Sequence, residues 1–440
     1  MTPKRAAGGG ERAAPSAGLR RVIGRWDLTA AVVNGVVGSA IFGLPATLAG
    51  LTGAWSPVSA LVAGLGILAI VLCLAEVASR FSAAGGPYLH AHEAFGPLAG
   101  FEVGWLAFWT RVLSAAANLN VFALYLGELV PAAASGAGRL VAMTALFGLV
   151  AAINVVGVRQ ATWAVDLFTL AKLAPLVLLV LLGVFRVRTD VLATQTVERP
   201  DWTQAVLLLI FAYGGFEAAL IPAGEARNPR RDTAFALLAA LGLIAALYFL
   251  VQLVVVGVVP HAAAVRAPIA AAFAALVGPA GATFATLAAT LSIYGWATGT
   301  TLQSPRLLFA MAERGELPAP LARIHPRFRT PAVAIVVFAL LTLGCAFWGS
   351  FAWNATLAAI VRLLYFALTA IALFVFRRRG GEAPGFRLPA AGFVAPVALL
   401  FCCWLLATRT SAQIWILAAM ILAGLPFYLA GRRVRGPRAG

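Results

Sequence analysis

The chain alternates long apolar stretches with short polar segments over most of its length. A helix needs about 20 apolar residues to cross the hydrocarbon core of a bilayer. Twelve stretches reach or approach that length, and each predicts one membrane-spanning helix. We therefore expect an all-α polytopic membrane protein with 12 transmembrane helices, at residues 28–50, 56–79, 98–130, 138–157, 161–185, 203–224, 234–258, 269–300, 331–349, 353–376, 389–407 and 412–431.

The first of these spans contains residues that oppose a regular helix. The stretch from Asn34 to Pro45 reads N-G-V-V-G-S-A-I-F-G-L-P. Each glycine weakens a helix by roughly 1 kcal/mol relative to alanine, and Pro45 has no N–H to offer the carbonyl of Ile41. Backbone that leaves a helix in lipid must find polar partners, because hydrocarbon offers none. The pattern predicts a discontinuous helix whose break faces a cavity or a ligand.

The sixth span has a similar weak point. Gly214 and Gly215 weaken its middle, and Pro222 and Gly224 weaken its end. The two weak points lie five spans apart, and an odd number of spans inverts the second repeat relative to the first. Paired interrupted helices predict an inverted-repeat transporter with a site near the midplane. The alternative is that the glycines only allow neighbouring helices to pack closely.

Composition places the chain among membrane proteins. Of its 440 residues, 62% are hydrophobic and 11% are charged, and the mean hydropathy is +0.92, which is typical of polytopic membrane proteins. The net charge of +17 could suggest a nucleic-acid partner, but the basic residues lie in short loops between apolar stretches. We therefore expect no nucleic acid, and a lipid bilayer as the surroundings.

The basic residues also predict the orientation in the membrane. If the N-terminus is inside, most of the 33 lysines and arginines fall in cytoplasmic segments. The external loops then hold only Arg139, Arg186, Arg188, Arg199, Arg266 and Arg409. This asymmetry predicts that both termini are cytoplasmic, in a multi-pass protein of the plasma membrane, which we expect to be a bacterial inner membrane.

The segments outside the spans carry no sign of other chemistry. Residues 1–26 are basic, rich in glycine and alanine, and have no apolar core, so we expect a disordered cytoplasmic tail rather than a signal peptide. A second short tail covers 432–440. The four cysteines and four histidines show no metal-ligand spacing, and we find no P-loop or nucleophile–base motif. We therefore predict no metal, no cofactor and no enzymatic activity.

Four groups of residues resemble motifs of the amino acid–polyamine–organocation (APC) transporter superfamily, in the family's order. They are Gly38-Ser39-Ala40-Ile41-Phe42 in the first helix; Ala75-Glu76, Gly85-Gly86-Pro87-Tyr88 and Phe95-Gly96 after the second; Phe211 to Glu217, Gly224-Glu225 and Asn228-Pro229 in and after the sixth; and Ser304-Pro305-Arg306, Ala310-Met311-Ala312, Leu317-Pro318 and Thr330-Pro331 in and after the eighth. The family's second glycine is Ala40 here. Alanine keeps the amide, although a left-handed conformation there would cost energy.

The resemblance implies a five-plus-five inverted repeat with discontinuous helices 1 and 6. The first repeat would cover 27–185, the second 201–379, and two further helices 387–431. It also implies a permease that moves an amino acid across the membrane by alternating access. We expect proton-coupled symport. Exchange of amino acids or amines is the alternative, and a sensor that binds an amino acid without flux is a third reading.

A broken helix offers both halves of a receptor for a zwitterion. The amides of Ser39 and Ala40, with the Ser39 hydroxyl, lie at the positive end of a half-helix and suit a carboxylate. Carbonyls freed from the helices, at Val36, Phe211, Ala212 and Gly214, suit the ammonium group. The candidate substrate-binding residues at the two breaks are Val36, Gly38, Ser39, Ala40, Ile41, Phe211, Ala212, Tyr213 and Gly214.

Side chains must supply the selectivity. Phe211 and Tyr213 could close over the substrate, or they could pack in the core. Trp296 resembles a pocket tryptophan of arginine-exchanging relatives. Asn118 could contact a substrate side chain or bond to another helix. No acidic residue lies clearly in the expected pocket, which favours neutral over cationic amino acids.

Lys172 lies about halfway along the fifth span, where a charged side chain is costly. Because low-dielectric surroundings disfavour the charged form, such a lysine can release and take up a proton near neutral pH. It matches a lysine that many proton-coupled relatives place beside the first-helix break, so we expect a proton-coupling role. The alternative is a fixed hydrogen bond to first-helix carbonyls.

Other charged residues lie within or beside the spans. Arg111 and Arg362 should face protein or water rather than lipid. The carboxylates of Glu76, Glu217 and Glu225 could form a gate network with Arg80 or Arg231, or they could simply be solvated at the membrane surface.

Overall fold

The computed structural model describes residues 24–38, 40–81, 86–157, 162–216, 228–380 and 384–435. Within these ranges the chain forms helices and no strands, as predicted for an all-α protein. The helices are α1 (Arg25–Val36), α2 (Ala40–Thr52), α3 (Ser56–Ala78), α4 (Gly86–Phe95), α5 (Pro97–Leu129), α6 (Gly136–Val156), α7 (Thr162–Gly183), α8 (Thr189–Ala193), α9 (Trp202–Tyr213), α10 (Pro229–Val258), α11 (Pro268–Val277), α12 (Pro279–Glu313), α13 (Ala332–Trp348), α14 (Phe351–Arg379), α15 (Ala391–Ala407) and α16 (Ser411–Arg435).

Many of the helices suit a bilayer. Among the described residues, six helical stretches are long and apolar enough to cross a membrane: Ala40–Ala78, Pro97–Leu129, Gly136–Val156, Arg231–Val258, Phe351–Arg379 and Ser411–Gly431. Four shorter apolar helices accompany them: Trp202–Tyr213, Pro268–Val277, Ala332–Trp348 and Ala391–Ala407. Large apolar side chains such as Leu65, Leu181 and Leu400 are exposed on the outside. Such a surface suits lipid rather than water, because hydrocarbon accepts apolar side chains without cost.

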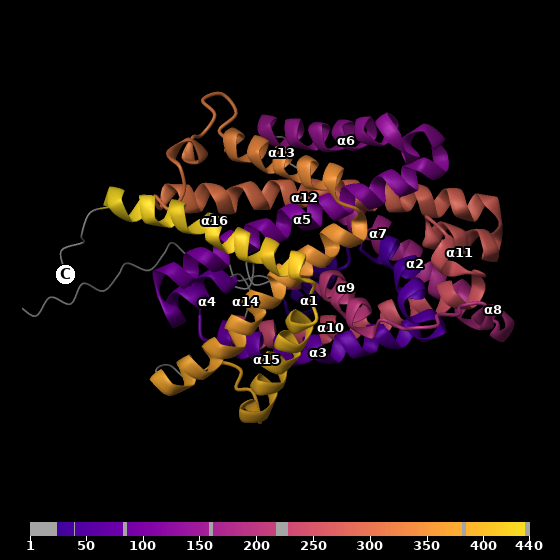
Figure 1. Ribbon diagram of the computed structural model, residues 1–440, viewed down its shortest axis with the longest axis horizontal. Coiled ribbons are helices and arrows are strands. Elements are labelled where there is room, and N and C mark those ends of the chain that lie inside the picture. The colour runs from indigo at the N-terminus through magenta and orange to yellow at the C-terminus, as the bar shows by residue number, and fades with distance from the viewer. Residues whose placement is uncertain are drawn as a thin grey trace, which may run out of the picture.

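Helices α1, α2 and α9 lie between other helices. Figure 1 shows α5, α12, α13 and α6 on one side of α1, α2 and α9, with α3 and α10 on the other side. The long helix α14 contacts α5, α3 and α9, so it bridges the two sides. The short helices that carry the predicted breaks are thereby surrounded by protein.

The predicted break in the first span is present. Helix α1 ends at Val36, Val37 is extended, and α2 begins at Ala40. Gly43 and Pro45 were expected to oppose the helix, but both lie inside α2. Gly43 packs tightly, because a β-carbon there would lie 2.7 Å from Val121 Cγ2. The carbonyl of Pro45 accepts a hydrogen bond from Gln252 Nε2 at 3.1 Å. The interruption is therefore shorter than the sequence pattern suggested.

The sixth span is also interrupted where predicted. Helix α9 ends at Tyr213, and Gly214 is extended. Gly215 follows with a φ of +121°, which side chains other than glycine rarely adopt. From residue 217 onward this span lies outside the described residues, and with it Glu217, Pro222, Gly224 and Glu225.

Two elements differ from the sequence prediction. The stretch 269–300 was expected to be one span, but it forms α11 and the start of α12. Gly278, with a φ of +81°, separates them, and Pro279 begins α12. Glycine just past one helix and proline at the start of the next are the usual end and start signals. Helix α4, in a stretch expected to be a loop, was also not predicted.

Two hydrophobic clusters form the core. The larger joins α1, α2, α3, α9, α10 and α14 among others, and the smaller joins α5, α6, α12 and α13. Helices α5 and α12 contribute side chains to both clusters. The candidate site lies against these two shared helices.

Candidate functional site

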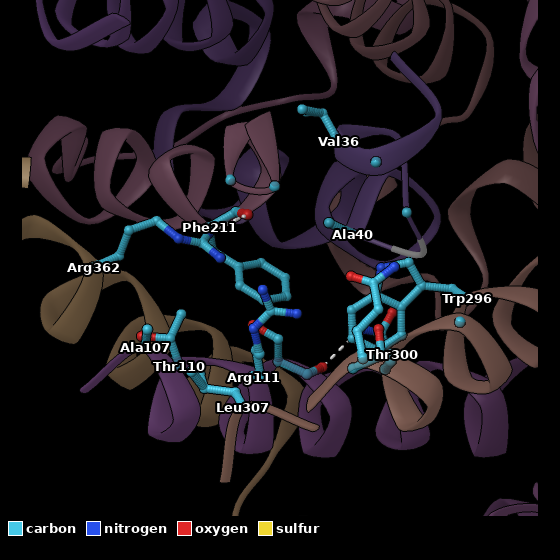
Figure 2. A pocket seen from close by; sticks show the side chains of 18 of the residues that line it. Val36, Ala40, Ala107, Thr110, Arg111, Phe211, Trp296, Thr300, Leu307 and Arg362 are labelled. Atoms are coloured by element: carbon cyan, nitrogen blue, oxygen red, sulfur yellow. Dashed lines mark hydrogen bonds between the residues drawn. The ribbon is translucent and has the colours of Figure 1, made fainter. Parts of the chain in front are cut away.

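A cavity of about 720 Å³ lies where the interrupted helices end. Its walls come from α1, α2, α4, α5, α7, α9, α12 and α14. Figure 2 shows the ends of the first helix and α9 on one side of this space, with α5 and α12 opposite. The volume is in the range of small-molecule sites in proteins.

Most of the residues predicted for the site line this cavity. They are Val36, Gly38, Ala40, Asn118, Lys172, Phe211, Ala212, Gly214 and Trp296. Ile41 and Tyr213 are buried but do not belong to the lining. Ser39 lies outside the described residues.

Tyr213 points away from the cavity. Its hydroxyl donates a hydrogen bond to the carbonyl of Ala60 on α3 at 2.8 Å. Its ring packs against Tyr248, with 5.2 Å between the ring centroids, and the residue is 1% exposed. This placement agrees with the packing alternative for Tyr213.

The start of α2 forms one end of the site. The first amides of a helix have no acceptor within the helix, and they carry the positive end of its dipole. The lining includes Ala40 at this end. A β-carbon on Gly38 would lie 3.2 Å from Cδ1 and Nε1 of Trp296, so the indole packs directly on the break. This end can receive an anionic group beside an aromatic wall.

Arg362 caps the opposite end of the site. Its Nη1 donates to the carbonyl of Phe211 at 3.2 Å, and its Nε donates to the Tyr365 hydroxyl at 3.1 Å. The residue is 6% exposed. Since the last carbonyls of a helix lack partners and carry its negative end, a guanidinium stabilises them. A β-carbon on Gly214 would lie 1.4 Å from Arg362 Nη1, so this contact requires glycine.

The two breaks meet backbone to backbone. A β-carbon on Gly215 would lie 2.5 Å from the Gly35 carbonyl oxygen, and one on Gly35 would lie 3.4 Å from the Gly215 carbonyl oxygen. The close approach excludes a side chain at residue 215, where φ is also +121°, whereas the distance at Gly35 is an ordinary contact. The interrupted helices are therefore neighbours in space, although about 180 residues separate them along the chain.

Lys172 lies at the end of α1. Its Nζ donates to the carbonyl of Asn34 at 2.5 Å, and the residue is 6% exposed. Asn34 is in the last turn of α1, where carbonyls lose their intrahelical donors. The lysine thus binds a carbonyl freed by the break. This contact is compatible with a proton-coupling role and with a fixed structural hydrogen bond.

Asn118 has an unused acceptor in the cavity wall. Its Nδ2 donates to the Ser114 carbonyl at 2.6 Å within α5, while its Oδ1 is buried without a hydrogen-bond partner. Ser114 Oγ is likewise buried without a partner. Both side chains can therefore bond to a ligand in the cavity.

The cavity wall is basic. It includes Arg111, Lys172, Arg306 and Arg362, and no aspartate or glutamate is among the described residues that line it. The sequence indicated only that Arg111 and Arg362 should avoid lipid. The signal that could have placed them here is that an arginine deep in an apolar span needs a polar lumen.

Glu76 lies outside the cavity, near the end of α3, and forms an ion-pair cluster. It is 0% exposed and accepts bonds from Arg377 Nε at 2.9 Å and from Arg80 Nη2 at 3.0 Å. It also accepts from the Leu388 amide at 2.8 Å. Pairing with Arg80, one of the two readings of Glu76, is present, and Arg377 and the Leu388 amide are partners that the sequence did not indicate.

Known proteins resemble this chain over nearly all of its length. The sequence model of the amino acid permease family matches residues 23–426. The serine/threonine exchanger SteT of Bacillus subtilis is 26% identical over 432 residues, covering 93% of this chain and 97% of the exchanger. The methylthioribose transporter of the same species is 28% identical, covering 91% and 92%. The human large neutral amino acids transporter small subunit 2 is 28% identical, covering 98% and 85%.

Proposed function

This chain belongs to the amino acid permease family, and on that basis we propose that it is a secondary active transporter that moves an amino acid across the plasma membrane by alternating access. The observation that carries the proposal is the contact of two interrupted helices beside one cavity. Interrupted helices expose main-chain groups of both polarities at membrane depth, where a zwitterion needs them. The first repeat would cover 27–185 and the second 201–379, with both termini in the cytoplasm.

The proposed binding mode uses the two helix ends. The substrate carboxylate would accept hydrogen bonds from the start of α2, at Ser39 and Ala40. The ammonium group would donate to carbonyls of Val36 and Gly214. Two carbonyls that the sequence also suggested already have donors: Phe211 binds Arg362, and Ala212 binds the Tyr248 hydroxyl at 3.0 Å. Phe211 and Trp296 would cover the bound substrate from opposite walls (Figure 2).

For energy coupling we propose proton symport through Lys172. Its Nζ is buried against the Asn34 carbonyl, so protonation changes the charge directly at the first break. A proton that binds there would favour one arrangement of the broken helix over the other. Exchange is the second candidate, because SteT is an exchanger by name. A sensor without flux would need the same pocket but an incomplete cycle.

Proteoliposomes distinguish these readings. Purified protein is reconstituted and the uptake of a mixture of labelled amino acids is measured, either with an inward proton gradient or with unlabelled amino acids inside. Uptake driven by the gradient into empty vesicles supports symport. Uptake only into preloaded vesicles would replace symport by exchange. Ligand-induced thermal stabilisation without flux in either condition would contradict transport.

A further inference from the structure

Asn118 on α5 holds a hydrogen-bond acceptor whose direction is fixed. Its Nδ2 donates to the Ser114 carbonyl at 2.6 Å. Because a carbonyl can only accept, the amide nitrogen must face it, and Oδ1 must point away from it. Asn118 is 4% exposed, and this Oδ1 has no hydrogen-bond partner in the part of the chain that the structure describes. The residue therefore retains a buried acceptor that a donor could satisfy.

Two serines add unpaired hydroxyl groups to the same wall of the cavity. Ser114 precedes Asn118 by about one turn of α5, and Ser292 lies on α12, which packs against α5. Both serines are buried, and neither Oγ has a hydrogen-bond partner among the described residues. Asn118, Ser114 and Ser292 all line the cavity. The wall thus combines an acceptor-only oxygen with two hydroxyls that can donate or accept.

Unpaired polar atoms in a cavity wall indicate what the ligand carries. Buried polar atoms are nearly always hydrogen-bonded to protein, water or a ligand. An acceptor that stays unpaired when a ligand fills the cavity costs free energy. A ligand that supplies a donor at this point is therefore favoured over a ligand of the same shape that lacks one.

The position of these atoms relates them to the side chain of the substrate. Figure 2 shows the ends of the first helix and α9 on one side of the cavity, with α5 and α12 opposite. In the proposed binding mode, the carboxylate and ammonium groups lie at the helix ends. The side chain of the substrate must then extend toward α5 and α12, where Asn118, Ser114 and Ser292 lie.

We infer that the substrate is a neutral α-amino acid whose side chain carries a hydrogen-bond donor, a hydroxyl or an amide, and that Asn118 Oδ1 accepts from this donor. Ser114 and Ser292 bond to the remaining polar atoms of that side chain. This inference rests on the proposed transport function and names its substrate class. Of the two sequence-based readings of Asn118, it takes the contact with a substrate side chain, since the printed bond of Asn118 stays within α5.

The test compares amino acids that differ only in the donor. Uptake of labelled L-threonine is measured against L-valine, and L-serine against L-α-aminobutyrate, with a proton gradient and in preloaded vesicles. In each pair a methyl group replaces the hydroxyl, and L-glutamine against L-methionine tests an amide on a longer side chain. We expect the preferred donor-bearing amino acid to be taken up at least about tenfold more efficiently than its apolar counterpart, which leaves the acceptor unpaired.

A pair of asparagine variants tests the role of Asn118. Asn118→Leu removes the acceptor and nearly keeps the side-chain size. It should lower uptake of the donor-bearing amino acid at least about tenfold and change uptake of the apolar counterpart by less than about threefold. Asn154→Leu on α6 is the matched control. Asn154 Nδ2 makes the same kind of bond, to the Val150 carbonyl at 2.9 Å, but the residue does not line the cavity.

The control variant should keep the wild-type preference, and melting temperatures show whether both variants fold. Equal uptake of donor-bearing and apolar amino acids by wild type would overturn the inference and leave the proposed transport function standing. A preference that survives in Asn118→Leu, or an equal loss of both substrates in the folded variant, would show that Asn118 does not read the side chain. Flux of no amino acid under either condition would instead contradict the proposed function itself.

Discussion

The guanidinium of Arg362 occupies the space that a side chain at residue 214 would need. A β-carbon on Gly214 would lie 1.4 Å from Nη1, which donates to the Phe211 carbonyl. Two features noted separately in the sequence, a glycine in one span and an arginine in another, thus depend on each other. The cap on α9 requires both.

Gly214→Ala should therefore strongly reduce transport. The added methyl group must displace the guanidinium, which leaves the last carbonyls of α9 without a donor at a cost of about 1–3 kcal/mol. We expect uptake in proteoliposomes to fall more than about tenfold and the melting temperature to drop. Gly242→Ala, in α10 with no atom within 4 Å of the added carbon, is the control and should behave like wild type. Full activity in Gly214→Ala would show that the cap is dispensable.

Lys172→Ala should remove the response of uptake to pH. The variant loses the only described side-chain donor to the Asn34 carbonyl, so some loss of stability is expected under either reading of this lysine. A proton-coupling role predicts more, namely that gradient-driven uptake disappears while exchange in preloaded vesicles continues. Initial rates across a pH series provide the measurement. If the variant kept the wild-type pH profile, the coupling role would be wrong.

Glu76→Gln should destabilise the protein. The carboxylate is buried and accepts bonds from Arg377, Arg80 and the Leu388 amide, so glutamine cannot match the charge of the two partly exposed guanidiniums. Losing charge-assisted hydrogen bonds of this kind costs about 1–3 kcal/mol. Thermal unfolding in detergent measures the effect. Arg378→Gln, an exposed neighbour of Arg377, should leave the melting temperature unchanged, and an equal drop in both variants would argue against the cluster.

Glu102→Gln should be neutral or stabilising. Both carboxylate oxygens of Glu102 on α5 are buried without a hydrogen-bond partner. An ionised carboxylate without partners is costly to bury, and a neutral amide of the same shape avoids the charge. We expect an unchanged or higher melting temperature at pH 7 and above. Glu128→Gln, exposed on the same helix, serves as the reference. A clear drop specific to Glu102→Gln would indicate a partner for this carboxylate.

His90 should make stability depend on pH. It is 3% exposed in α4 and its ring packs against Phe81, with centroids 4.9 Å apart. Burial lowers the pKa of His90 from 6.5 to about 4. Below about pH 6.5 the unfolded chain binds a proton that the folded chain does not, so stability should fall as pH falls toward 4, by up to about 1.4 kcal/mol per pH unit.

His90→Phe removes this titration. Its melting temperature should therefore fall less than that of wild type between pH 6.5 and 5. Identical pH slopes for the two proteins would show that His90 is not responsible.

The sequence predicted the fold class and both interruptions because glycine and proline act locally. Gly38, Gly214 and Gly215 weaken a helix in any apolar stretch. Gly43 and Pro45 carry the same signal but lie inside α2, so packing decides which weak point becomes a break. The boundary at Gly278 was missed although its signal, glycine followed by proline, is also local. It was hidden because the apolar character continues on both sides of it.

The sequence pointed to residues at the two breaks and also to Asn118, Lys172 and Trp296, and these three line the cavity. The described residues predicted at the breaks line the cavity, except Ile41 and Tyr213, whose directions depend on how the half-helices rotate against α3 and α10. The sequence indicated that Arg111 and Arg362 would be costly in lipid, but it did not indicate that both line the same cavity. Arg362 bonds to the Phe211 carbonyl, which is 151 residues away along the chain, and only packing brings the two together.

The contact of Gly35 with Gly215 has a mechanical consequence. Two rods that touch through bare main chain have no flexible side chain between them to absorb a displacement. When one half-helix tilts, the other must tilt or slide with it. Substrate binding at either break would therefore displace both half-helices. Through this contact alone, opening of the site toward one side of the membrane would be coupled to its closing toward the other.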